Sequence, residues 1–182
     1  MSRKYKFRDQ SASYFVTFTS VYWIDVFTRR LYKDILVESI NYCIENKGLV
    51  VYAWVIMSNH VHLIIGSNDE KMEDILRDLK KHTSKTIVKT IEENQQESRR
   101  EWMLWMFERA AKKNSNNSKY QFWQQHNHPL VLSNPYAFEQ RLNYIHENPV
   151  QAGFVDNPVH YPYSSAIDYA DGKGSVKIVI AR

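Results

Sequence analysis

Residues 49–66 read LVVYAWVIMSNHVHLIIG, and the fold of the chain is best inferred outward from this stretch. The unbroken apolar run from Leu49 to Met57 is typical of a buried strand. Ser58 and Asn59 form a short polar turn, and a second apolar segment, His60 to Gly66, follows directly. The stretch therefore predicts a β-hairpin made of two buried strands.

The chain before this hairpin predicts a strand followed by a helix. Residues 14–22, YFVTFTSVY, alternate apolar with Thr or Ser positions and are rich in aromatic and β-branched types, which favours a strand. From Thr28 to Asn46, apolar residues recur at helical spacing. We expect Thr28 to cap the start of this helix and Gly48 to end it.

The chain after the hairpin predicts a long amphipathic helix from Lys71 to Glu93, since its apolar residues form one stripe. Residues 97–117 are typical of a helical or irregular excursion that ends in a polar loop, and residues 121–132 of an extended segment. The string HNH at residues 126–128 is too short to indicate an HNH endonuclease and is interpreted as chance.

A further helix is predicted from Pro135 to Glu147, with Asn134 as its N-cap and proline at its first position. Pro149 then begins a tail that contains the strand-like segment VKIVI at residues 176–180. The order β-α-β-β-α-β predicts an α+β, ferredoxin-like antiparallel sheet with helices on one face, to which a C-terminal helix and the tail are added.

The length of 182 residues indicates a single domain, 1–182, with a core at about 14–148 and a tail at 149–182. A single cysteine, Cys43, excludes an internal disulfide framework and a cysteine-based zinc cluster. The sequence shows no signal peptide and no apolar run of the ~20 residues that a membrane span needs. We therefore expect a cytoplasmic protein without membrane association, located at the nucleoid when bound to DNA.

The charge and aromatic content point weakly to nucleic acid. The chain has 24 Lys and Arg against 20 Asp and Glu, and 12 tyrosines. Basic and aromatic residues together are typical of proteins that bind single strands, because bases stack on aromatic rings. Arg77, Lys81 and Lys85 share one face of the helix predicted at 71–93 and are candidates for phosphate contacts; a simple solvated helix face explains them equally well.

His60 and His62 lie two residues apart in a predicted strand, so both imidazoles project from the same face. Two such imidazoles can hold a divalent metal ion, although a third ligand must come from elsewhere in the chain. Alternatively, the pair consists of ordinary strand histidines that are satisfied by neighbours or water. Tyr144 and Asn148 lie four residues apart on one helix face, and an Asn oxygen can ligate a metal beside a tyrosine nucleophile. His146 and Glu147 are nearby alternatives as ligand or base.

Five segments in this order resemble the REP-associated tyrosine transposases, a group of the HUH superfamily of single-strand DNA transposases within the IS200-like family. They are YFVTFTS at 14–20, AWVIMSNHVHLII at 53–65, DLKKHTSKTI at 78–87, FWQ at 122–124 and YIHENPVQAGFV at 144–155. Two departures are visible: Ser58 stands where the family often has proline, and residues 97–119 form a longer stretch than expected.

The resemblance implies a ferredoxin-like fold, a divalent metal held by His60, His62 and Asn148, and Tyr144 as the nucleophile. It implies cleavage and rejoining of single-stranded DNA, at hairpins or palindromic repeats, through a 5′-phosphotyrosine intermediate. Imidazole ligands favour Mn²⁺ in vitro, while abundant Mg²⁺ could serve in the cell. Related enzymes differ in whether the tyrosine helix acts in its own chain or is shared across a homodimer, and both arrangements remain open.

Two other functions fit the same residues. The first is a domesticated protein that binds DNA hairpins without productive cleavage. The second is a metal-dependent phosphodiesterase that uses activated water, in which Tyr144 is structural.

Overall fold

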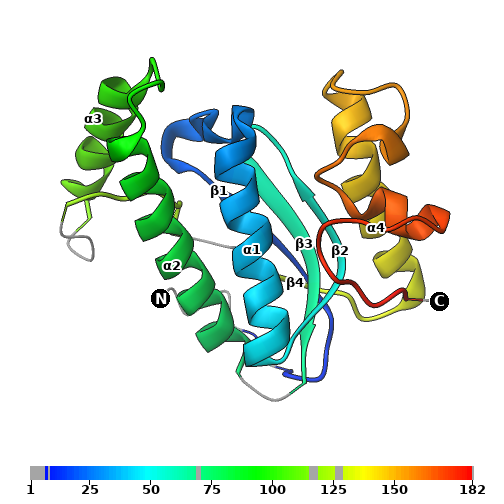
Figure 1. Ribbon diagram of the computed structural model, residues 1–182. Helices are drawn as coiled ribbons and strands as arrows, with labels where there is room; N and C mark the ends of the chain where they lie inside the picture. The colour runs from blue at the N-terminus through cyan, green and yellow to red at the C-terminus, as the bar shows by residue number, and fades with distance from the viewer. Residues whose placement is uncertain (1–6, 8, 69–70, 115–118, 126–128, 182) are drawn as a thin grey trace.

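The computed structural model describes residues 7, 9–68, 71–114, 119–125 and 129–181. In these ranges four strands form one antiparallel sheet in the order β2-β3-β1-β4 (Figure 1). The strands are β1 (Tyr14–Thr19), β2 (Leu49–Ile56), β3 (His60–Ser67) and β4 (Leu130–Val131). The helices are α1 (Arg30–Lys47), α2 (Met72–Glu93), α3 (Arg100–Ala111) and α4 (Pro135–Gln151). The predicted ferredoxin-like α+β fold is confirmed, with α3 inserted between α2 and β4.

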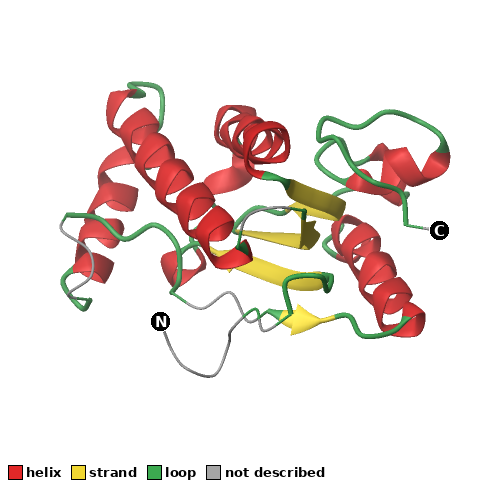
Figure 2. Cartoon of the chain, turned by 90° about the horizontal axis from the view of Figure 1, so that it is seen from below, coloured by secondary structure: helices red, strands yellow, loops and turns green. Residues whose placement is uncertain are grey.

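The β2–β3 hairpin is confirmed, and β1 pairs with the other edge of β3, so that β3 and β1 are the central strands. Helices α1 and α2 cover one face of the sheet, and α4 lies on the other side (Figures 1 and 2). The prediction of helices on one face therefore holds for α1 and α2. None of the described helices is long and apolar enough to cross a membrane.

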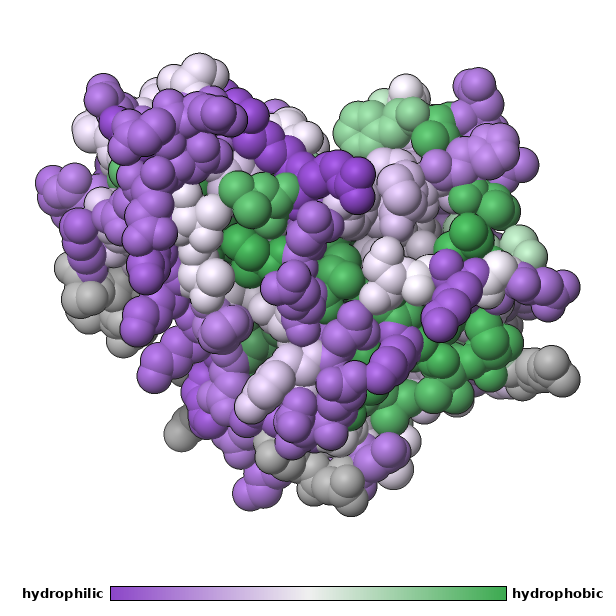
Figure 3. All heavy atoms as spheres, viewed as in Figure 1, coloured by the Kyte–Doolittle hydropathy of each residue, from purple (hydrophilic) through white to green (hydrophobic). Residues whose placement is uncertain are grey.

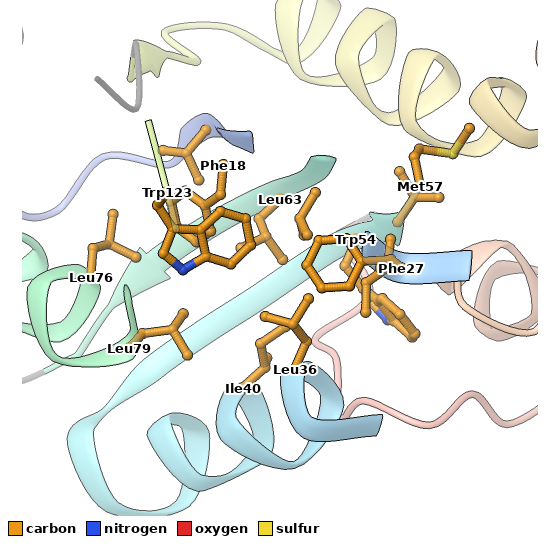
Figure 4. Close-up of a cluster of buried hydrophobic side chains, with 14 of the residues drawn as sticks. Phe18, Phe27, Leu36, Ile40, Trp54, Met57, Leu63, Leu76, Leu79 and Trp123 are labelled. Carbon is orange, nitrogen blue, oxygen red and sulfur yellow. The ribbon is translucent and has the colours of Figure 1, made fainter. Parts of the chain in front are cut away.

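The main core lies between the sheet and the pair α1 and α2. Leu63 of β3 points toward Leu36 and Ile40 of α1, while Phe18 of β1 lies beside Trp123 from the loop after α3 (Figure 4). Alternation of side chains along a strand places Leu63 on this face and its neighbour His62 on the other. On the surface, an apolar groove between α1 and α2 interrupts the mostly hydrophilic exterior of the helices (Figure 3).

Several predicted boundaries on the N-terminal side were wrong. Strand β1 ends at Thr19 rather than Tyr22, because the chain turns at Tyr22 and Trp23, which have positive φ angles of 54° and 56°. Helix α1 begins at Arg30, and Thr28 is not its cap because Thr28 ends a short 3-10 turn. Gly48 does end the helix in the left-handed conformation, with φ 66°, as expected.

The C-terminal third also differs from its prediction. Of the described residues in 121–132, Leu130–Val131 form the strand β4 and Trp123 makes an isolated antiparallel bridge to Ser20. Residues 126–128, with the HNH string, lie outside the described residues. Helix α4 does not stop at Glu147 but continues through Pro149 to Gln151. Pro149 has no N–H to donate to the Ile145 carbonyl oxygen one turn earlier, and the helix ends two residues after it. The backbone N–H of Phe154 donates to the Pro149 carbonyl oxygen at 2.9 Å.

The tail covers the free edge of β2. The backbone N–H of Ile56 donates to the Tyr163 carbonyl oxygen, and that of Val179 donates to the Val51 carbonyl oxygen, both at 2.9 Å. The segment VKIVI is thus no strand, although it runs beside one. An edge strand presents unpaired backbone groups that favour aggregation, so this cover protects the sheet.

A buried carboxylate, Glu97, ties the ends of α1 and α2 together. Its side chain is fully buried and forms ion pairs with Arg29 at 2.7 Å and with Arg99 at 3.4 Å. Arg99 also donates to the Asp25 carbonyl oxygen at 3.0 Å and to the Thr28 hydroxyl at 3.1 Å. Burial raises the pKa of Glu97, but the backbone N–H of Arg99 and the Arg29 guanidinium outweigh it and hold the pKa below its usual range. The carboxylate thereby fixes the loop between β1 and α1.

Replacing Glu97 with Gln should lower the free energy of unfolding at neutral pH by about 2 kcal/mol, since charge-assisted bonds to both arginines are lost. A depressed carboxyl pKa contributes stability that is lost as the pH falls below about 4, so the difference between wild type and variant should narrow there. Denaturant titration measures both effects. Glu101→Gln is the matched control because that side chain is 92% exposed; an equal loss in both variants would contradict the role of Glu97.

Candidate metal and tyrosine site

His60 and His62 project from the same face of β3, as their spacing predicted, with ring centroids 4.7 Å apart. Antiparallel pairing places Thr19 of β1 opposite His60 and Thr17 opposite His62. Both imidazoles therefore lie on the central strand β3, and its backbone pairing with β1 and β2 holds their positions.

His62 is almost fully buried, at 5% exposure. Its Nδ1 lies 2.8 Å from the Thr17 hydroxyl, and its ring stacks on Phe15 with centroids 5.3 Å apart. Among the described residues its Nε2 is buried without a hydrogen-bond partner. When the Thr17 hydroxyl accepts a hydrogen bond from the Nδ1–H group, Nε2 is unprotonated and carries a free lone pair. This is the arrangement of a metal-ligating histidine.

The orientation of His60 is set by the turn of the hairpin. Its Nδ1 lies 2.7 Å from the Asn59 Oδ1. The Asn59 Nδ2 donates to the Asp25 carboxylate at 3.0 Å, so its Oδ1 is the atom that faces His60. An amide oxygen only accepts, so Nδ1 carries the proton and the Nε2 of His60 also presents a lone pair.

Asn148 supplies the third candidate ligand from α4. Its Nδ2 donates to the Tyr144 carbonyl oxygen at 2.8 Å, which leaves Oδ1 as the free end of the amide. This side chain also meets His60 and raises the pKa of that imidazole, as an amide oxygen does. The Asn148 side chain and the His60 imidazole are therefore adjacent, which is where one cation would take a ligand from each.

Both histidines are held in the neutral form that binds metal. Burial, then the charges of His60 and Arg141, lower the pKa of His62 to about 3. Burial also lowers the pKa of His60, although Asn148 opposes it. Nowhere in the described part of the chain do three His, Cys, Asp or Glu side chains gather into a metal site, so a three-ligand site at His60 and His62 would need the Asn148 amide.

Tyr144 lies beside the two histidines, 39% exposed, with its ring centroid 5.2 Å from that of His62. One turn earlier on α4, the Arg141 guanidinium lies 5.8 Å from the Tyr144 ring and 5.1 Å from the Phe15 ring. Within the described residues, no carboxylate pairs with Arg141. A cation without a carboxylate partner, next to a tyrosine hydroxyl, is suited to bind a phosphate group.

The structure brings together Tyr144, Asn148, His60 and His62, but not the alternatives His146 and Glu147. The His146 Nε2 lies 3.0 Å from the Ser165 hydroxyl, in the tail, and burial lowers the pKa of His146 to about 4. Glu147 is exposed. Sequence reasoning missed Arg141, although its position three residues before Tyr144 on the same helix face could have indicated it. It also missed Thr17 and Asn59, whose roles depend on strand register and on the hairpin turn.

The candidate DNA-binding residues fall into two groups. Lys81 and Lys85 line a groove between α2 and residues 119–125, together with Lys80, Lys89 and Lys119. Arg77 lies apart from this groove and pairs with two carboxylates, Asp74 and Asp78. The structure thus places two of the three predicted contacts on one basic surface, and their role in binding DNA stays a prediction.

This fold, with a histidine pair on a central strand and a tyrosine helix against it, corresponds to a class of DNA-processing proteins. Residues 9–107 match the family described as transposase IS200-like, and the chain belongs to that family. The matched range includes His60 and His62 and ends before Tyr144. A search of curated proteins gives no match.

The similar solved structures include a REP-associated tyrosine transposase bound to a REP hairpin. The likeness covers 100% of both chains with a TM-score of 0.65 and 16% sequence identity. At this identity the comparison establishes the fold. The predicted resemblance to this group and the α+β architecture are both confirmed.

Stability should fall as the pH is lowered from about 6.5 toward 4, because the unfolded chain binds protons on histidine there while the folded chain does not. His60, His62 and His146 have pKa values lowered by burial and contribute in the same direction. Thermal unfolding measured across this range tests the effect. A melting temperature that stays constant down to pH 4 would show that the imidazoles are not held neutral.

Proposed function

We propose that this protein cleaves and rejoins one strand of DNA by transesterification through Tyr144. The observation that carries the proposal is the position of α4, which places the Tyr144 ring 5.2 Å from His62 and the Asn148 amide on His60. A nucleophile, two imidazoles and an amide oxygen therefore meet within one chain. This geometry supports action of the tyrosine in its own chain rather than across a homodimer.

The residues fit a divalent metal. The fit rests on the orphaned His62 Nε2 and on the adjacent His60 imidazole and Asn148 amide, which supply a nitrogen and an oxygen. Two nitrogens and one oxygen suit Mn²⁺ better than Mg²⁺, which prefers oxygen ligands. When bound, the metal would polarise the scissile phosphate and neutralise charge on its oxygens.

The chain's own residues account for the remaining steps. The Tyr144 oxygen attacks the phosphorus, the bond between phosphorus and the 3′ oxygen breaks, and a 5′-phosphotyrosine forms. The phenol proton passes to solvent, and the departing 3′ oxygen gains a proton to become a free hydroxyl. Arg141 offers guanidinium N–H groups to the non-bridging oxygens, where negative charge develops. Attack by another 3′-hydroxyl on the phosphotyrosine reverses the sequence and rejoins DNA without ATP.

We infer that the DNA is a single strand carrying a hairpin, since the similar solved structure is a complex with a REP hairpin. Lys81 and Lys85 in the basic groove would contact phosphates, and affinity should then weaken with rising salt. The protein would act in the cytoplasm, on the nucleoid.

Replacing Tyr144 with Phe should abolish covalent attachment to DNA while hairpin binding is kept, because only the attacking oxygen is removed. The substrate is a single-stranded hairpin taken from DNA that flanks the gene, incubated with Mn²⁺, and the adduct is followed by denaturing electrophoresis. Tyr136→Phe, on the same helix and 76% exposed, is the matched control and should form adduct normally.

Other outcomes identify the alternatives. Binding without cleavage in the wild type would indicate a domesticated hairpin-binding protein. Cleavage that survives Tyr144→Phe would instead indicate a phosphodiesterase that uses activated water, with Tyr144 as a structural residue.

Replacing His62 with Ala should remove cleavage and weaken Mn²⁺ binding by at least about tenfold, with hairpin affinity largely unchanged, because a ligand is lost from the centre. Titration calorimetry with Mn²⁺ and a hairpin-binding assay measure the two effects separately. His82→Ala, an exposed histidine on α2, serves as the control. If His62→Ala loses hairpin binding and cleavage equally, the histidine supports the fold rather than the metal.

A further inference from the structure

An exposed aromatic turn follows β1 and is not used by the proposed reaction. Tyr22 and Trp23 are 40% and 59% exposed and are consecutive residues with positive φ angles. A residue other than glycine costs about 1–3 kcal/mol in a sparsely populated backbone region. The chain therefore bears strain at two large aromatic residues whose side chains contribute little to the core.

The turn is held firmly in this strained form. The backbone N–H of Trp23 donates to the Ser20 carbonyl oxygen at 3.2 Å, and the Ser20 hydroxyl donates to the Ile24 carbonyl oxygen at 2.8 Å. The Asn59 Nδ2 donates to the Trp23 carbonyl oxygen at 3.3 Å. The same Asn59 side chain orients His60, so the aromatic turn and the histidine pair are positioned by one residue.

The rings of Tyr22 and Trp23 contact different parts of the molecule. The Trp23 ring centroid lies 6.1 Å from that of His60, so the indole borders the proposed catalytic centre. The Tyr22 ring lies under the Lys113 ammonium, 5.8 Å away, and lines a surface hollow on the side of α3. The turn thus joins the catalytic centre to a second surface.

That second surface continues into the lysine groove. Gln121 and Gln125 line both the hollow at Tyr22 and the groove that contains Lys81 and Lys85. A continuous path therefore runs from the lysines, past these glutamines and Tyr22, to Trp23 and His60. It combines cations for phosphates with exposed rings for bases, which is the combination that binds single strands without sequence preference.

We propose that the Tyr22–Trp23 turn is a base-stacking platform for the single strand that runs from the lysine groove to the scissile phosphate. Trp23 stacks the base next to the phosphate that Tyr144 attacks, and Tyr22 stacks a base further toward the groove. The proposal rests on the proposed function for the identity of the nucleic acid. It adds a subsite for bases next to His60.

The test measures binding rather than cleavage. Fluorescence anisotropy measures the affinity of the wild type, Trp23→Ala and Trp23→Phe for two labelled probes. One probe is an oligodeoxythymidine, and the other is the same phosphodiester chain without bases. Loss of one stacked base should weaken oligodeoxythymidine binding by about tenfold to a hundredfold in Trp23→Ala, with partial recovery in Trp23→Phe. The abasic chain should bind wild type and Trp23→Ala equally, because it has no base to stack. Trp105→Ala, an exposed tryptophan of α3, is the matched control.

A stability measurement on Trp23→Gly gives an independent readout. Glycine adopts positive φ without strain, so this variant should melt at a higher temperature than Trp23→Ala while it binds oligodeoxythymidine equally weakly.

Unchanged affinity in Trp23→Ala, or equal losses on both chains, would overturn the platform and would make the turn a candidate contact for a protein instead. Formation of the covalent adduct on the flanking hairpin is measured in a separate assay. If the wild-type protein binds bases by stacking but forms no adduct, only the proposed reaction is contradicted.

Discussion

The pairing register of β1 with β3 is the constraint on which the rest of the site depends. It places Thr17 opposite His62 and Thr19 opposite His60, with Phe15 beneath the His62 ring. A slip of one residue would turn every side chain of β1 to the other face of the sheet. Val16 and Phe18, now in the core, would then face α4, and His62 would lose both its hydroxyl partner and its stacking ring. The burial of the core therefore also enforces the geometry of the two imidazoles.

Two amide side chains, Asn59 and Asn148, position the His60 imidazole on this pair of strands. Asn59 fixes the proton of His60 on Nδ1, and Asn148 contacts the same imidazole while its Nδ2 donates to the Tyr144 carbonyl oxygen. Neither amide carries a charge, although the Asp25 carboxylate accepts a hydrogen bond from Asn59 at 3.0 Å. Both imidazoles are buried and neutral at physiological pH, which is the protonation state in which a histidine can accept a cation. Arg141 also favours the neutral form of His62, since its positive charge opposes protonation of that imidazole.

Local pattern predicted the parts of the fold whose side chains alternate or repeat regularly. The alternation in residues 14–19 and 60–65 was sufficient for two central strands and for the common face of His60 and His62. Apolar spacing was sufficient for α1 and α2, and Gly48 for the end of α1. The sequence could not indicate the turn at Tyr22 and Trp23, because aromatic residues favour a strand locally and only the contacts with Ser20 and Asn59 overrule that preference. Likewise, the role of Thr17 exists only once the two strands are paired.

The strained turn at Tyr22 and Trp23 is connected to the buried Glu97 carboxylate by a series of hydrogen bonds and ion pairs. Glu97 holds Arg99, and Arg99 holds the backbone of Asp25, while the Asp25 carboxylate accepts from the same Asn59 that orients His60. A loop that bears two positive φ angles would relax if its flanks were free. Anchoring one flank through a buried ion pair and the other through β1 keeps the Trp23 ring beside His60 and the Tyr22 ring beside Lys113. The insertion between α2 and β4, from which Glu97 and Arg99 come, thus helps to position the turn that contacts His60.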